Sequence, residues 1–203
     1  MENKIVVFDF DKTLTFKDTV FSFFLNVAEK NFYFIFKFLF YFFLMILYKF
    51  RVISNSTLKR IGVYLFLKNQ SLSILTEKSL DFIKKIKFNE LFKSYDFNNP
   101  SEEIYIVSAS FEIYLRLIFQ DSVKIIGSKL ITKEGVVQSV GVNCFGEKKV
   151  ELLNNENIKR IDKLYTDSLS DLPLAKISSL ITIVSRDLLI KCNNYSDFKN
   201  ILK

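Results

Sequence analysis

One apolar segment, residues 32–48, constrains the fold of this chain more than any other feature. It is 17 residues long and carries one charge, that of Lys37. As an α-helix it would be roughly 25 Å long, slightly short of the hydrocarbon thickness of a bilayer. Whether it crosses a membrane depends on where the polar residues before and after it must meet.

Strand and helix patterns alternate after residue 103. Short apolar, β-branched runs predict strands, and apolar residues at helical spacing predict helices. We expect strands at residues 5–8, 104–107, 123–127, 129–132, 136–140, 163–165 and 181–184, and helices at 111–119, 148–153 and 172–177. This alternation predicts an α/β fold, a doubly wound, Rossmann-like parallel sheet with the active site at the carboxyl ends of its strands.

Residues 17–91 interrupt the pattern after its first strand. We expect helices following Asp18 as an N-cap, across the apolar segment, and at 58–67 and 72–87. The chain is therefore predicted to have a core of residues 1–16 and 92–203 and an α-helical cap of residues 17–91. The cap holds 12 Lys and Arg against 5 Asp and Glu, whereas the rest balances at 17 against 17. Such a basic, apolar insertion indicates different surroundings from the core; a solvated basic face is the alternative.

Composition excludes several classes of function. The chain has no His, which removes Ser-His-Asp hydrolysis, Cys-His proteolysis and His-ligated zinc. Two Cys in 203 residues suggest no disulfide framework and fit a reducing compartment. The first residues do not resemble a secretory signal, so we expect a cytoplasmic protein. No nucleic-acid partner is expected, and the oligomeric state is left open.

Two carboxylates, Asp9 and Asp11, directly follow the first predicted strand. At positions i and i+2 they point the same way, into a site at the carboxyl end of that strand. One can attack a phosphorus atom while the other protonates the leaving oxygen and then activates water. Acidic turns after strands are common, so this pair alone is a weak indication.

Three further polar groups arrive in order, each near a strand end or a helix start. Ser108 can hold a phosphoryl oxygen, and Lys149 can neutralise phosphate charge and restrain Asp9. Asp167 and Asp171 have a spacing suited to Mg²⁺ and its surroundings. Taken singly, each is better explained by a structural role: Ser108 as a helix cap, Lys149 as a solvated lysine and Asp171 as an N-cap. Together and in this order they predict a phosphoryl-transfer site.

With these four motifs the sequence resembles the haloacid dehalogenase superfamily of phosphatases, over nearly the whole chain outside the cap. The resemblance implies that Asp9 is the nucleophile that forms an aspartyl-phosphate and that Asp11 is the general acid and base. It also implies that Thr13 and Ser108 bind phosphate and that Lys149 is the lysine of the third motif.

The same resemblance implies a Mg²⁺ ion. Its ligands would be Asp9, the backbone carbonyl of Asp11 and Asp167, with Asp171 in a supporting position. Two departures concern loop geometry, because Lys12 and Thr166 stand where many members have Gly.

Two alternatives concern the register of the motifs. Lys148 is adjacent to Lys149 and is the other candidate for the third motif. "DKTLT" also resembles the phosphorylation motif of ion pumps, which would make Asp11 the nucleophile. That register puts Thr13 rather than a carboxylate two residues on, and Leu14 where the pumps have Gly, so Asp9 is preferred. With Asp9 as nucleophile, the residue two positions on is the carboxylate Asp11. A carboxylate there favours rapid dephosphorylation, as in a phosphatase.

The motifs also decide the topology of the apolar segment. Asp9 precedes it and Ser108 follows it, so both flanks must lie on one face of any membrane, and the stretch at 61–67 is too short to return the chain. We expect an interfacial or re-entrant helix around residues 32–50, at the inner face of the cell membrane. Basic residues would meet anionic headgroups and tyrosines would form an interfacial belt: Lys30, Lys49, Arg51, Lys59, Arg60, Tyr33, Tyr41 and Tyr48.

Other interpretations of the segment stay open. Phenylalanines at every second position would fit a strand, and the segment would also fit the buried centre of the cap or a dimer surface. With the fourth motif, "YTDSLSDLPL", it resembles the branch containing phosphatidylglycerophosphatase C. This implies a lipid headgroup phosphate such as phosphatidylglycerophosphate as substrate. The alternatives are a soluble phosphatase of a metabolite such as phosphoserine, and a non-catalytic membrane adaptor.

Overall fold

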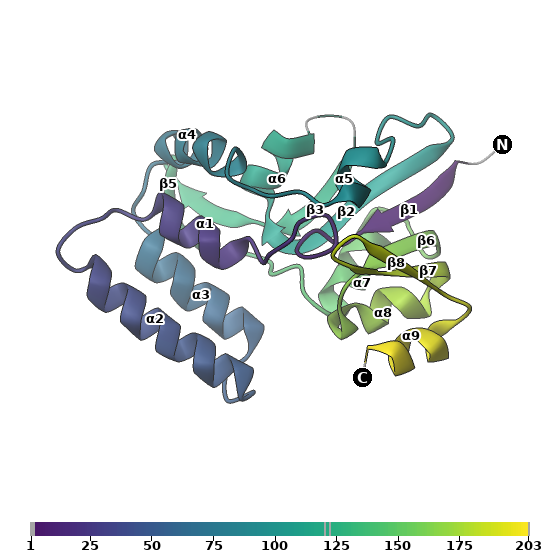
Figure 1. The fold of residues 1–203 in the computed structure, drawn as a ribbon. Coiled ribbons are helices and arrows are strands. Elements are labelled where there is room, and N and C mark those ends of the chain that lie inside the picture. The colour runs from purple at the N-terminus through teal and green to yellow at the C-terminus, as the bar shows by residue number, and fades with distance from the viewer. Residues whose placement is uncertain (1–2, 120, 122, 203) are drawn as a thin grey trace.

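A computed structural model describes residues 3–119, 121 and 123–202 (Figure 1). Its centre is a six-stranded sheet in the order β3-β2-β1-β6-β7-β8, parallel except for β8. The strands are β1 (Lys4–Phe8), β2 (Glu102–Phe111), β3 (Lys124–Ser128), β6 (Ile161–Thr166), β7 (Ser178–Ser185) and β8 (Leu188–Cys192). A separate antiparallel hairpin is formed by β4 (Leu130–Lys133) and β5 (Val136–Val140). The predicted α/β fold is confirmed.

Helices cover both faces of the sheet, because alternate residues of its central strands face opposite sides. In β1, Val6 and Phe8 belong to one buried apolar cluster and Val7 to the other. The first cluster includes residues of α6 (Glu112–Phe119). The second includes residues of α7 (Glu147–Asn155), α8 (Leu172–Lys176) and α9 (Tyr195–Ile201).

Within the described residues, the first four of the five helices between β1 and β2 belong to the insertion. They are α1 (Val20–Val27), α2 (Phe34–Lys49), α3 (Asn55–Phe66) and α4 (Leu72–Ile83). Figure 1 shows α1, α2 and α3 side by side, beyond the end of the sheet toward which β1 runs. Their buried residues share a cluster with β1 and β2, so this insertion is packed onto the sheet. The exact domain boundaries at residues 16/17 and 91/92 stay predictions.

The apolar segment is a helix, so the strand interpretation is wrong. Only Tyr41 and Leu44 of α2 are buried. Most of its other apolar side chains are exposed, which also excludes the buried centre of the cap. Among the described residues, no helix combines the length and the apolar character needed to cross a membrane.

Several elements were not predicted, namely α5 (Glu90–Ser94), β8, α9 and the short 3₁₀ turn η1 (Leu169–Asp171). Strand β2 also continues to Phe111, past the predicted end at residue 107. Its pairing with β3 shifts register between Val107 and Phe111. Ser108 therefore lies inside β2 at an irregularity, and not after the strand as predicted. A bulge of this kind depends on the partner strand and leaves no local periodicity.

Candidate active site

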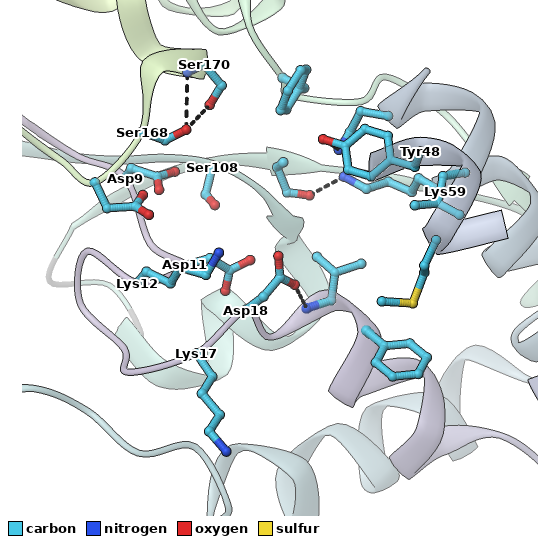
Figure 2. Close-up of a pocket in the computed structure, with 18 of the residues that line it drawn as sticks. Asp9, Asp11, Lys12, Lys17, Asp18, Tyr48, Lys59, Ser108, Ser168 and Ser170 are labelled. Atoms are coloured by element: carbon cyan, nitrogen blue, oxygen red, sulfur yellow. Dashed lines mark hydrogen bonds between the residues drawn. The ribbon is translucent and has the colours of Figure 1, made fainter. Parts of the chain in front are cut away.

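A cavity of about 700 Å³ lies at the carboxyl ends of β1 and β6. Five of the seven predicted site residues line it, namely Asp9, Asp11, Ser108, Lys149 and Asp167. Figure 2 shows Asp9 and Ser168 on one side of the cavity and Tyr48 and Lys59 on the opposite side, with Asp11 and Ser108 between them. Residues far apart in the chain thus meet as the motif order predicted.

Lys149 lies between two carboxylates. Its Nζ atom is 2.7 Å from Asp9 Oδ1 and 2.6 Å from Asp171 Oδ1, and the side chain is only 2% exposed. Burial alone lowers the pKa of Lys149, but the two carboxylates outweigh it and hold that pKa above its ordinary value. Lys149 is therefore a fixed positive charge against Asp9. Lys148 instead pairs with Glu151 at 2.5 Å on the exposed face of α7.

Asp11 has no cation within ion-pair distance among the described residues, and hydroxyl groups hold it instead. Its Oδ1 accepts hydrogen bonds from Thr19 N (2.9 Å) and Thr19 Oγ1 (2.5 Å), and its Oδ2 accepts one from Ser110 Oγ (2.9 Å). Burial, reinforced by the nearby charge of Asp18, raises the pKa of Asp11 to about 8. A carboxyl group with a raised pKa is suited to donate a proton.

Thr19 and Ser110 were missed by the sequence analysis. Thr19 comes just before α1, and its hydroxyl also lies 2.8 Å from the hydroxyl of Tyr114. Ser110 is two residues beyond Ser108, and its backbone N donates to Ser108 Oγ at 3.2 Å. The repeated serine in "IVSAS" was the available signal. Nothing local in the sequence pointed to Thr19.

Thr13 is buried behind the cavity and is not one of the residues that line it. Its hydroxyl donates a long hydrogen bond of 3.5 Å to Asp9 Oδ2. Lys12, which precedes it, has a φ of 60°, in the left-handed region that favours glycine. Glycine adopts this conformation at less cost than lysine, so Lys12 is held in a mildly strained backbone conformation.

The carboxylate of Asp171 is fully buried, and both of its oxygens have a contact inside the protein. Oδ2 accepts a hydrogen bond from Thr166 Oγ1 at 2.7 Å, and Oδ1 lies against Lys149. Thr166 was one of the two departures noted in the sequence. Its hydroxyl, which a glycine would lack, donates this hydrogen bond to Asp171. Asp171 is placed to hold Lys149 rather than to reach into the cavity.

Asp167 follows β6 and lines the cavity near Asp9. Burial, and next the charge of Asp9, raise the pKa of Asp167 to about 7. Within the described part of the chain, no group of three or more Asp, Glu, His or Cys is arranged to hold a metal ion. The predicted ligand set has only two carboxylates and one carbonyl. Such hard oxygen donors fit Mg²⁺, which takes one or two protein carboxylates and keeps several waters.

Two residues of the insertion, Lys59 and Tyr41, are not at a membrane-facing surface as the sequence analysis expected. Lys59 is 4% exposed and donates to the Ala109 carbonyl, to Ser128 Oγ (3.0 Å) and to Asn143 Oδ1 (2.5 Å). It therefore cannot face headgroups as expected, because α3 turns it toward β2 and β3. Tyr41 is likewise buried rather than interfacial.

The comparisons with known proteins bear on this arrangement. A model of the haloacid dehalogenase-like hydrolase family matches residues 6–176. The chain belongs to this family. It is thus a hydrolase, and the prediction of an enzyme is confirmed. No curated protein is similar enough in sequence to count as a match.

Solved structures agree on the fold. A Bordetella pertussis protein of unknown function has 17% identity and a TM-score of 0.68, covering 86% of each chain. A phosphoserine phosphatase, solved as a phospho-aspartyl intermediate analogue, has 18% identity and a TM-score of 0.64 over 100% of both chains. A family hydrolase from Salmonella enterica serovar Typhi has 14% identity and a TM-score of 0.60, covering 87% of this chain and 60% of that one.

Proposed function

We propose that this protein is a Mg²⁺-dependent phosphomonoester hydrolase that forms an aspartyl-phosphate on Asp9. The observation that carries the proposal is the contrast between Asp9 and Asp11, two of the carboxylates that line the cavity. Asp9 lies 2.7 Å from the ammonium of Lys149, which places a fixed positive charge against the oxygen that would act as nucleophile. Asp11 has a pKa raised to about 8 by burial, as a general acid requires. Two carboxyl groups in different environments suit the two halves of one reaction.

The reaction would take place in two steps. In the first, a carboxylate oxygen of Asp9 forms a bond to phosphorus, the bond to the leaving oxygen breaks, and Asp11 gives its proton to that oxygen. In the second, the Asp11 carboxylate takes a proton from a water molecule, whose oxygen displaces Asp9 from phosphorus. Ser108 would donate to a phosphoryl oxygen, and Lys149 would stabilise the charge that develops. The phospho-aspartyl analogue solved for a protein of the same fold supports this scheme.

Asp9, Asp167 and the Asp11 carbonyl would hold the Mg²⁺ ion. When bound, it would neutralise charge on the phosphoryl group and on the two neighbouring carboxylates. Asp171 and Thr166 would not contact the ion. Thr166 orients Asp171, and Asp171 holds Lys149 in place.

We further propose that the substrate is a lipid headgroup phosphate, such as that of phosphatidylglycerophosphate, at the inner face of the cell membrane. The support is the outer face of α2. Phe36, Phe40 and Phe43 recur at helical spacing and are 60%, 51% and 53% exposed. Exposed cations flank the helix at Lys30, Lys49, Arg51 and Arg60. An apolar face with basic flanks suits an anionic membrane surface.

The test of the chemistry is Mg²⁺-dependent phosphate release from an aryl phosphate. Asp9→Asn is expected to abolish release, and Asp11→Asn to reduce it by roughly 10²–10⁴-fold. Both variants should keep the wild-type circular dichroism spectrum. Full activity in Asp9→Asn would instead favour Asp11 as the nucleophile, or reject the phosphatase proposal if Asp11→Asn is active too.

The test of the substrate is a panel of lipid and soluble phosphomonoesters, assayed with and without Mg²⁺. We expect the highest kcat/KM on a lipid in vesicles. A preference for phosphoserine would favour the alternative of a soluble metabolite phosphatase. Absence of hydrolysis across the panel would favour a non-catalytic membrane adaptor.

A further inference from the structure

Next to Lys59, the cavity is lined by a group of apolar and aromatic side chains that have no role in the proposed chemistry. We define this apolar wall as Val20 and Phe21 of α1, Tyr41, Met45 and Tyr48 of α2, and Leu58 of α3. Tyr48 of this wall lies on the side of the cavity opposite Asp9 (Figure 2). A phosphate group bound at Asp9 leaves this wall free.

Ring contacts hold the wall in place. Tyr41 is 3% exposed and stacks on Phe21, with ring centroids 5.9 Å apart and an interplanar angle of 16°. Its other sides meet Phe24 and Phe66 edge-on, at 5.6 and 5.4 Å. Burial raises the pKa of the Tyr41 phenol above its ordinary value, so the ring carries no charge at neutral pH. The wall is thus an ordered, uncharged surface.

The cavity volume is far more than phosphate needs. About 700 Å³ lies within the range of roughly 300–1,000 Å³ that accommodates a drug-sized organic molecule. Covering apolar surface in such a space with hydrocarbon is favourable, because it removes that surface from water.

We propose that the apolar wall is a subsite for a hydrocarbon part of the leaving group, several carbons from the phosphoester oxygen. This rests on the proposed phosphomonoesterase function and narrows its substrate class to amphiphilic phosphomonoesters. Helix α2 has the wall on one face and the exposed Phe36, Phe40 and Phe43 on another. The same helix thus presents one face to the cavity and another to the proposed membrane surface, so an amphiphile could contact both.

The first test is a series of n-alkyl phosphates from ethyl to octyl, each below its critical micelle concentration. We expect kcat/KM for phosphate release to rise by up to about fourfold for each methylene group that the wall covers. A flat dependence on chain length, with activity on an aryl phosphate retained, overturns the subsite and leaves the phosphatase proposal standing. No release from any phosphomonoester rejects the phosphatase proposal, and the subsite with it.

Variants at Met45 locate the effect. Met45→Gln keeps the side-chain length but adds an amide, and should lower the octyl-to-ethyl ratio of kcat/KM several-fold. Met45→Leu should restore that ratio. Ile74→Gln is the control: it makes a comparable change on α4, where the side chain is 50% exposed and does not line the cavity. This variant should keep the wild-type octyl-to-ethyl ratio. An equal loss on ethyl and octyl phosphate in Met45→Gln contradicts the proposal. If Met45→Gln does not fold, the wild-type series still decides.

The hydrocarbon has two possible sources, a soluble amphiphile and a bilayer lipid. The triple variant Phe36→Ser, Phe40→Ser, Phe43→Ser separates them. A larger loss on phosphatidylglycerophosphate in vesicles than on octyl phosphate in solution assigns the bilayer lipid. An equal change on both assigns the soluble amphiphile.

Discussion

At the scale of single residues, the acidic end of the cavity depends on the ammonium group of Lys149. It lies within 2.7 Å of Asp9 and 2.6 Å of Asp171, and neither it nor Asp171 has appreciable exposure. Removing one partner of a buried charge pair costs much more than the pair contributes, because the remaining charge stays buried without compensation. An exposed pair such as Lys148 with Glu151 has no such cost.

Lys149→Ala should therefore lower the free energy of unfolding by about 3–5 kcal/mol, and Lys148→Ala by less than about 1 kcal/mol. Lys149→Ala should also slow phosphoryl transfer while leaving Mg²⁺ binding largely intact. Urea unfolding and aryl phosphate turnover over a Mg²⁺ titration measure these effects. A larger loss of activity in Lys148→Ala would assign the third motif to that residue instead.

Lys59 gives a prediction about pH. Burial lowers its pKa from 10.5 to about 8, although Asp11 and other charges oppose this. Below pH 8 the ammonium is charged in the folded and unfolded states, and its burial cost is fully present. Between about pH 8 and 10.5 the folded protein has released the proton while the unfolded chain retains it. The unfolded state then binds more protons, so stability contributed by Lys59 rises with pH.

The comparison that isolates this effect is wild type against Lys59→Met. Urea titrations at several pH values give the unfolding free energy of each protein. The wild type should become more stable relative to Lys59→Met as pH rises through this window. A constant difference between pH 7.5 and 10 would mean that the three hydrogen bonds of Lys59 hold its pKa near the ordinary value.

At the scale of elements, the exposed face of α2 is the feature on which the proposed membrane association rests. Fully burying one phenylalanine side chain is worth about 1.5–3 kcal/mol, and salt screens the basic flanks without weakening that burial. We expect the protein to sediment with anionic membranes and to remain bound in high salt. The triple variant Phe36→Ser, Phe40→Ser, Phe43→Ser should release it, and should reduce lipid turnover far more than aryl phosphate turnover.

A matched control lies on the far edge of the sheet. Leu180, Leu188 and Leu189 are 59%, 68% and 51% exposed on β7 and β8, and changing them to Ser should leave sedimentation unchanged. Wild-type protein that stays in the supernatant, and prefers phosphoserine to every lipid, would count against the membrane proposal. A concentration-dependent dimer that the phenylalanine changes dissociate would make α2 a subunit contact.

At the scale of the whole molecule, the proposed Mg²⁺ ion would link metal binding to folding. An ion that binds only the folded state at 100 times its Kd stabilises it by about 2.7 kcal/mol. For a chain of this size that corresponds to a rise in Tm of roughly 5–10 °C. We expect Mg²⁺ to raise the Tm of the wild type, and EDTA to reverse the rise. In Asp167→Ala the rise and the activity should be lost together, because Asp9 and one carbonyl hold the ion poorly. A Tm shift retained in this variant would place the metal elsewhere.

Local patterns in the sequence predicted five of the six strands of the sheet, the longer inserted helices, and five residues that line one cavity. Strands such as β1 are short β-branched runs, and the carboxyl ends of parallel strands must share one edge, so Asp9 and Asp167 were expected to meet. Strand β8 and helix α9 were missed, because β8 is an exposed edge strand whose residues show no clean alternation.

The tertiary structure alone decided which side chains surround each carboxylate. Thr19 and Ser110 bond to Asp11 from 8 and 99 residues away, and Lys59 reaches Ser128 and Asn143 from α3. Periodicity encodes the face of a helix that is buried, but it does not encode which polar atoms that face will meet. Those contacts depend on the packing of the insertion against β2 and β3, which is set by burial across the whole molecule. For the same reason Lys59 and Tyr41, which resemble surface residues in sequence, are buried beside the cavity.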